Sequence, residues 1–181
     1  MRLFFVVVLC GLLCGGFFGL SAQSEGMLPR WEVMELSKSI VESVDQAKSV
    51  LEQVRPKEWQ QDGAPSAYVD QYESLGIDLG NLRLSAEALG RQPEKLSVVI
   101  DTLLWLDRAS SMVGSMAGGV RRYQNAAVAD LLDAAVGNGV AAMATLKEYM
   151  RQLAVDQEAA MEIAHSEAQR CRERLATQPR D

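Results

Sequence analysis

The apolar residues of this chain recur every three or four positions over almost its whole length, and this period constrains the fold most. In the clearest case, residues 68–89, seven side chains follow a 4-3-4-3-4-3 spacing and fall on one stripe of a helix. They are Tyr68, Tyr72, Leu75, Leu79, Leu82, Ala86 and Leu89. No stretch shows the alternation of apolar and polar residues that marks a strand. The chain is therefore predicted to be all-α.

The same period predicts helices on both sides of this run. The first covers about residues 31–54 and is closed by Pro56, and the third covers about residues 94–120. Residues 126–176 contain no proline. The chain either turns near Gly137–Gly139 to give five helices, or continues as one helix that is long or bent there. A continuous helix of that length would span about 75 Å and overhang its neighbours.

Four to five amphipathic helices joined by short corners make an up-and-down helical bundle. We predict one such domain over residues 31–176, with a flexible lead at 23–30 and a disordered tail at 177–181. At this size, folding buries roughly 68% of the surface of the extended chain. The core therefore needs neither disulfides nor metal.

The second half of the third predicted helix is rich in small side chains. Residues 110–119 contain three serines, three glycines and one alanine, which lower helix propensity but let another helix approach closely. Gly76 and Gly80, on the second predicted helix, are the candidate partners for this approach. After it comes a short corner in which Asn125 is the expected N-cap of the last helix.

Residues 1–22 differ in composition from the rest of the chain. Arg2 is followed by an uncharged run of apolar residues and glycine at 3–20, and then by the small residues Ser21 and Ala22. This order of charged start, apolar middle and small-residue exit is typical of a secretory signal peptide. We therefore predict export, to the periplasm or the medium, after cleavage near Ser21 or Ala22. Without cleavage, residues 3–20 would anchor the chain in a membrane.

The charge of the chain excludes two classes of partner. The sequence has 18 basic and 24 acidic residues, and cleavage removes the basic residue Arg2, which takes the formal net charge from −6 to −7. Non-specific binding to nucleic acid or to anionic membranes needs clustered lysine and arginine. We therefore expect no nucleic-acid partner, and membrane contact only through residues 3–20 if these residues are not cleaved off.

Few residues are suited to catalysis. The chain has one histidine, His165, and three cysteines, of which Cys10 and Cys14 leave with the signal peptide. His165 and Cys171 are separated by about 9 Å along a helix and by about 120° around it, so they cannot form a dyad. We predict a protein without enzymatic activity or cofactor. Cys171 is expected to be a small apolar residue in a helix seam.

One spacing resembles a metal motif. Glu162-x-x-His165 is the pattern by which di-iron bundles present a carboxylate and an imidazole to one metal, and Glu158 shares that helix face. A di-iron site takes two such motifs, however, and the single histidine is directed to solvent by the helix phase. Several methionines could bind a soft metal, but their spacing beside leucine and valine favours core packing. These are Met112, Met116, Met143, Met150 and Met161.

Aromatic side chains mark a candidate binding surface. Residues 55–67 break the helix period and are predicted as a loop in which Trp59 is the large apolar side chain. Trp59, Tyr68 and Tyr123 would form an exposed patch for a partner, since exposed aromatics often mark binding sites. The alternative, which we favour, is that Trp59 folds back and caps the end of the bundle.

Four stretches of the chain form a combined pattern. They are Arg55-Pro56-Lys57-Glu58-Trp59 through Gly63-Ala64-Pro65 and Tyr68-Val69, Ser85-Ala86-Glu87-Ala88-Leu89 through Arg91-Gln92-Pro93-Glu94-Lys95-Leu96-Ser97, Gly119-Val120-Arg121-Arg122-Tyr123-Gln124-Asn125, and Glu167-Ala168-Gln169-Arg170-Cys171-Arg172. Together they resemble a group of exported bacterial proteins of unassigned function, over about residues 55–175. The resemblance implies a bacterial exported helical protein and no particular chemistry. Gly137-Asn138-Gly139 departs from the pattern, which is usually more helical there.

These features predict an exported, non-catalytic bundle that binds another protein or a component of the cell envelope. The contact is expected at the loop around Trp59 or at the overhanging C-terminal helix, where copies of the chain could also associate. The alternative function is a metal- or small-ligand-binding bundle of the cell envelope. It would use Glu158, Glu162 and His165, or the methionines.

Overall fold

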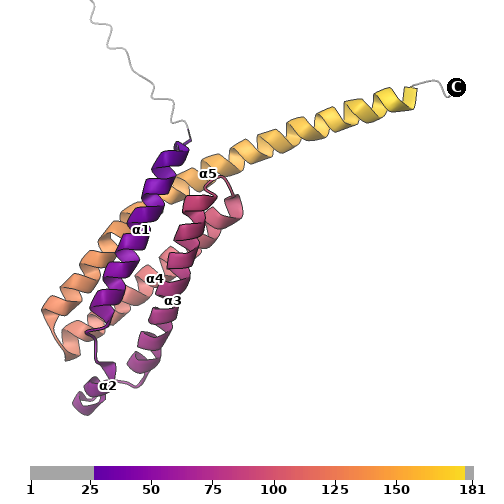
Figure 1. Ribbon diagram of the computed structural model, residues 1–181. Helices are drawn as coiled ribbons and strands as arrows, with labels where there is room; N and C mark the ends of the chain where they lie inside the picture. Colours follow the sequence, from indigo (N-terminus) through magenta and orange to yellow (C-terminus); the bar gives the residue numbers. More distant parts are fainter. Residues whose placement is uncertain (1–26, 178–181) are drawn as a thin grey trace, which may run out of the picture.

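The computed structural model describes residues 27–177, and every regular element in that range is a helix (Figure 1). The long helices are α1 (Arg30–Leu51), α3 (Ala67–Arg91), α4 (Leu96–Tyr123) and α5 (Ala126–Thr177). Between α1 and α3 lie α2 (Pro56–Trp59) and the 3-10 helix η1 (Gln60–Asp62). The prediction of an all-α helical bundle is confirmed. The predicted signal peptide, residues 23–26 of the lead and residues 178–181 of the tail lie outside the described residues.

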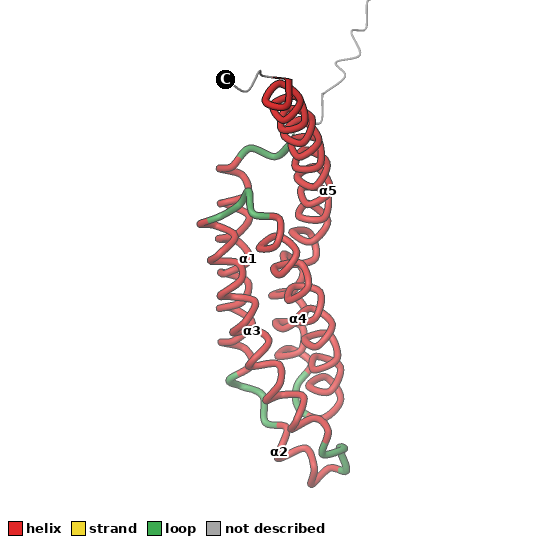
Figure 2. Tube along the Cα trace, turned by 90° about the vertical axis from the view of Figure 1, so that its right-hand side faces the viewer, coloured by secondary structure: helices red, strands yellow, loops and turns green. Residues whose placement is uncertain are grey.

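The four long helices form an up-and-down bundle. Helix α1 packs against α3 and α5, and α4 packs against the same two helices, so each has two neighbours around a common core. Helix α2 lies at one end of the bundle, and the last part of α5 extends beyond the other end (Figure 1, Figure 2). The two ends of the bundle therefore differ in construction.

Local signals in the sequence fix where helices begin. Pro29 is the N-cap of α1, and its carbonyl oxygen accepts hydrogen bonds from the backbone N–H groups of Glu32 and Val33. The side-chain oxygen of Asn125 accepts a hydrogen bond of 2.8 Å from the Ala127 N–H, in the first turn of α5. The prediction that Asn125 caps the last helix is therefore confirmed.

The apolar stripe of α3 faces the core as predicted. Leu75, Leu79, Leu82, Ala86 and Leu89 are buried, and the two tyrosines at the start of the stripe are half-buried. A second cluster of buried residues lies near the end at which α5 leaves the bundle. It contains Val33, Leu89, Val99, Leu103, Leu146, Tyr149 and Leu153. Burial of these side chains is the main stabilising contribution to such a fold.

Helix α5 is continuous and bent, and it passes through Gly137–Gly139 without a turn. The alternative of two separate helices is therefore wrong. A Cβ atom at Gly139 would lie 3.3 Å from Leu106 Cδ1, which shows how closely α5 approaches α4 at this point. Helix α5 has 52 residues and α4 has 28. Because α5 folds back along α4 after a short corner, nearly half of α5 extends past the start of α4.

Three local predictions are corrected. Residues 55–67 are not one loop, because α2 and η1 form there, and Gly63 ends η1 with a φ of 83°, a left-handed conformation that glycine adopts easily. Helix α4 begins at Leu96 rather than at Glu94. The predicted bounds of the domain change by one residue at each end: Arg30, which was assigned to the lead, is the first residue of α1, and Thr177, which was assigned to the tail, is the last residue of α5.

Candidate functional site

The end of α5 is exposed on all sides. Gln157 is half-buried, and its Nε2 donates a hydrogen bond of 3.1 Å to the carbonyl oxygen of Glu94, in the connection between α3 and α4. From Glu158 to Thr177 every residue is exposed. Figure 1 shows this part of α5 extending away from the bundle. We call residues 158–177 the projecting segment.

The projecting segment has an apolar face. At about 100° per residue, a set of small or apolar side chains falls within an arc of about 100° that contains no charged residue. The set is Ala160, Met161, Ala164, Ala168, Cys171 and Leu175. The arc continues the packed face of α5, since the buried residues Leu146 and Leu153 precede Ala160 at seven-residue intervals. Met161 is 72% exposed and Leu175 is 64% exposed, so this face is uncovered.

The candidate metal ligands Glu158, Glu162 and His165 all lie on the projecting segment and are exposed, as predicted for the histidine. His165 Nε2 lies 3.0 Å from Gln169 Nε2, so the imidazole has a hydrogen-bond partner on its own helix. Within residues 27–177, no group of three or more histidine, cysteine or acidic side chains is arranged to hold a metal ion. The three residues share a helix face, and that arrangement alone does not make a metal centre.

Cys171 is exposed, and the prediction that it is buried in a helix seam is wrong. Its neighbours on the helix face are small and apolar, as the sequence indicated. The seam is uncovered because α5 leaves the bundle before residue 158. Helix periodicity identified the face correctly but gave no information on whether another helix covers it.

The five methionines were predicted to pack in the core, and four of them do so. Met116 is fully buried, and Met112, Met143 and Met150 are half-buried against the core. Met161 does not pack in the core, because it lies on the projecting segment and is exposed. The methionines of the bundle therefore fill space between apolar neighbours, as thioethers commonly do.

Trp59 is 2% exposed, so it does not offer a binding surface. Its ring lies 5.6 Å from the Tyr68 ring in an edge-to-face arrangement and 6.0 Å from the Tyr123 ring in a stacked arrangement. Its Nε1 donates a hydrogen bond of 3.2 Å to Oε1 of Gln124. The exposed patch predicted from these aromatic residues is therefore wrong for Trp59. The favoured alternative, that Trp59 caps the end of the bundle, agrees with the structure.

A glycine makes room for this aromatic cluster. A Cβ atom at Gly119 would lie 2.6 Å from Tyr68 Cε1 and 3.1 Å from Trp59 Cζ3. The small residues of α4 therefore do permit a close approach, but the approaching groups are aromatic rings. In the described part of the chain, a Cβ atom at Gly76 or Gly80 would meet no atom closer than 3.9 Å. The prediction that these two glycines are the partners is wrong.

Gln124 is a residue whose role the sequence did not indicate. Besides the contact with Trp59, its Oε1 accepts a hydrogen bond of 2.9 Å from the Arg55 N–H, and its Nε2 donates one of 2.8 Å to the Gln53 carbonyl oxygen. One amide thus ties the corner between α4 and α5 to the segment that leads from α1 into α2. A polar residue in a predicted corner was the only signal, and such residues are too common to be informative.

An interhelical ion pair was also missed. Asp78 of α3 has a side chain that is 5% exposed, and its Oδ2 accepts a hydrogen bond of 2.6 Å from Nε of Arg108 on α4. Arg108 is 60% exposed. Because a buried carboxylate requires a partner, this contact explains how an acidic residue is accommodated next to the buried Leu79. The pair links two helices of the bundle.

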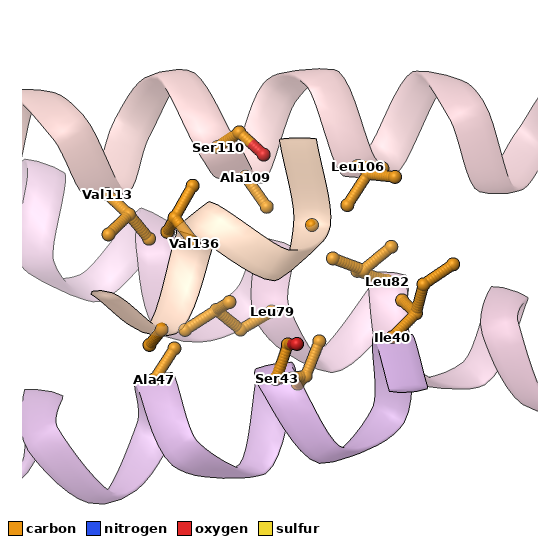
Figure 3. A pocket seen from close by; sticks show the side chains of 13 residues that line it. Ile40, Ser43, Ala47, Leu79, Leu82, Leu106, Ala109, Ser110, Val113 and Val136 are labelled. Carbon is orange, nitrogen blue, oxygen red and sulfur yellow. The ribbon is translucent and has the colours of Figure 1, made fainter. Parts of the chain in front are cut away.

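The interior of the bundle has little free space. A cavity of about 20 Å³ lies between the four long helices, and its lining is apolar apart from Ser43 and Ser110 (Figure 3). This volume holds about one water molecule. A depression of about 340 Å³ lies on the surface beside α2 and is lined by side chains of both charges. A ligand larger than water would therefore not fit the cavity between the four long helices.

Comparison with protein-family models, with curated proteins and with solved structures finds no match to this chain. Among residues 27–177, one helix, α5, is long and apolar enough to cross a membrane by length and composition. Core helices of other proteins meet the same criterion, and 31% of the apolar stretch of α5 is buried inside the protein. The projecting segment is the candidate functional site, because it is the longest part of the described chain that is exposed on every side.

Proposed function

We propose that this protein is an exported, non-catalytic helical bundle that binds a macromolecular partner through the projecting segment. The observation that carries the proposal is the exposure of every residue in 158–177 together with an uncovered apolar face. A helix that extends beyond its bundle gains no stability from tertiary packing. An amphipathic helix of this kind gains stability by laying its apolar face against a partner.

Export is supported by the first residues of the sequence. Residues 1–22 combine a basic start, an apolar middle and a small-residue exit. The acidic balance of the remaining chain supports a protein or envelope partner over nucleic acid. The resemblance to exported bacterial proteins supports the same location.

The other candidate surfaces support a binding role less well. The aromatic residues at the α2 end are occupied by one another and by Gln124. Glu158, Glu162 and His165 lie on the projecting segment itself, outside its apolar arc. A partner that covers this segment would therefore also lie close to these three side chains.

Photo-cross-linking in the cell that makes the protein tests the proposal. Met161, on the apolar face, is replaced by p-benzoylphenylalanine in one variant. Leu84, on α3 and 64% exposed, is replaced in the control variant, since it is an equally accessible apolar position outside the projecting segment. We expect adducts from position 161 and few from position 84. Equal labelling of both positions, or none at position 161, would contradict the proposal.

A further inference from the structure

We propose that the partner of the projecting segment is a second copy of this chain, bound side by side in the antiparallel direction. The inference rests on the proposed function, because it names the molecule that covers the same apolar face. It is carried by two independent features of residues 158–177, the order of their charges and the spacing of their apolar residues.

The charges of the projecting segment are divided between its two halves. Residues 158–167 contain three glutamates and no lysine or arginine, whereas residues 168–177 contain three arginines and one glutamate. The acidic half lies next to the bundle and the basic half lies at the tip. The six residues that create this division are Glu158, Glu162, Glu167, Arg170, Arg172 and Arg174.

This division makes the segment complementary to itself in one direction only. In an antiparallel pair, the basic tip of each copy lies beside the acidic base of the other, and the twofold symmetry repeats the same contacts at both ends. In a parallel pair, acidic residues would face acidic residues and basic would face basic. Charge order of this kind selects the orientation of paired helices.

The apolar face has the spacing of a two-stranded coiled coil. Met161, Ala168 and Leu175 follow at seven-residue intervals, and Ala164 and Cys171 do the same. These two series occupy the a and d positions of a heptad. The alanines in both series let two helix backbones approach closely. They also bury little area, so we expect a weak and reversible dimer.

The heptad assignment also brings charges of opposite sign to the edge of the seam. Glu167 and Arg174 both occupy g positions, seven residues apart. In an antiparallel coiled coil the g positions of the two helices face each other, so Glu167 of one copy lies beside Arg174 of the other. The contact occurs twice in the pair.

The course of α5 leaves room for this pairing. The projecting segment extends away from its own bundle (Figure 1). In an antiparallel pair, the two bundles therefore lie at opposite ends of the joined helices. Each tip reaches towards the base of the other segment without passing through a bundle.

Sedimentation equilibrium of the purified protein tests the pairing, at concentrations up to about 1 mM so that a weak dimer is populated. The acidic variant is R170E/R172E/R174E, and the basic variant is E158K/E162K/E167K. We expect the wild-type protein to dimerise, and less so at high salt. Each variant alone should dimerise at least about tenfold more weakly, because attractive contacts become repulsive. An equimolar mixture should regain the dimer, since it restores opposite charges at both ends.

Circular dichroism shows that the variants retain their helix content, so that a lost dimer is not mistaken for a melted helix. The proposal is overturned if the wild-type chain stays monomeric at about 1 mM. It is also overturned if both variants dimerise as the wild type does, or if their mixture stays monomeric.

The orientation is tested with spin labels on the outer side of the projecting segment. In a background with C10A, C14A and C171A, a single cysteine is introduced at Ser166 or at Ala159. In an antiparallel pair, moving the label by these seven residues lengthens the distance between the two labels by about 20 Å. Equal distances at both positions would mean a parallel pair and overturn the proposal.

The two proposals fail in different ways. If the label at position 161 cross-links to a different molecule and the chain is monomeric in the centrifuge, the proposed binding role stands. The proposal that the partner is a second copy of the chain is then wrong. If no adduct and no dimer form, both proposals are wrong. If the adduct has twice the mass of the chain, both are supported.

Discussion

The two ends of the bundle differ in whether large apolar side chains are buried or exposed. At the α2 end, the large side chain of Trp59 is buried, contacts the rings of two tyrosines and donates a hydrogen bond to Gln124. At the other end, α5 continues beyond its neighbours, and Met161 and Leu175 stay exposed. Trp59 lies in a segment that breaks the helix period of apolar residues, whereas Met161 and Leu175 belong to a helix face that keeps this period.

The difference shows what decides burial in a helical bundle. At the α2 end, short helices and a tight corner bring distant parts of the chain together. At the α5 end, the neighbouring helices have ended, so the apolar face has nothing of the same chain to pack against. Trp59 therefore contributes to the stability of the bundle, whereas Met161 and Leu175 contribute little to it. Each of the following substitutions tests one side of this division.

The largest effect is expected at the capped end. Trp59→Ala should lower the free energy of unfolding by about 3–5 kcal/mol, because it leaves a large cavity among aromatic neighbours. Trp31→Ala is the matched control, since Trp31 is 64% exposed, and it should change stability by less than about 0.5 kcal/mol. Urea unfolding measures both. Similar losses for the two variants would mean that the cap does not hold the bundle end together.

The next largest effect on stability is expected at the adjacent glycines Gly118 and Gly119 of α4. Gly119→Ala should destabilise the protein by about 1–3 kcal/mol, because the new methyl group would overlap the rings of Tyr68 and Trp59. Gly118→Ala, at an exposed position of the same helix, should instead stabilise it by about 0.5–1 kcal/mol through helix propensity. Thermal unfolding of both variants gives the comparison. A stable Gly119→Ala protein would contradict the close packing of the cluster.

Tyr149 marks the last strongly packed region before α5 leaves the bundle. Its hydroxyl donates a hydrogen bond of 3.0 Å to the Pro93 carbonyl oxygen. Tyr149→Phe removes this donor and should lower the free energy of unfolding by about 1 kcal/mol. Burial raises the pKa of Tyr149, and the negative charge of Glu94 raises this pKa further.

The folded protein therefore favours the neutral phenol. The resulting stability is fully present below the ordinary tyrosine pKa of about 10 and is lost as the pH rises through the higher pKa of the folded state. Urea unfolding at neutral pH and above pH 10 should show a smaller alkaline loss for Tyr149→Phe than for the wild type. An equally steep loss would assign the alkaline transition to other groups.

The smallest effects are expected in the projecting segment. His165→Ala and Cys171→Ala should each change the free energy of unfolding by less than about 0.5 kcal/mol, because both side chains are exposed outside the bundle. Thermal unfolding at low protein concentration separates this measurement from any association. A large fall in melting temperature for either variant would show that the segment folds back on the bundle.

Much of the fold follows from spacing alone. Leu75, Leu79 and Leu82 are buried because a helix places them on one side, and that inference requires only the period of 3.6 residues. The cap at Asn125 likewise follows from a side chain that can accept a backbone hydrogen bond. Such features depend on residues close together in the sequence.

Other features depend on contacts between distant residues, and these could not be predicted. Gln124 meets Arg55 and Trp59 only after the whole bundle has closed, and the same is true of Asp78 and Arg108. The exposure of Cys171 was missed for a related reason. Periodicity describes one helix, whereas burial depends on where the adjacent helix ends.

The uninterrupted course of α5 has a mechanical consequence. A helix is stiff, so residues 158–177 form an arm of about 30 Å whose direction is set where Tyr149 and Leu153 are held in the core. A rotation of only about 10° at Leu153 would move the tip by about 6 Å. Minor repacking around Tyr149 is thereby amplified at Leu175. The packing of the core thus determines the direction in which residues 158–177 extend.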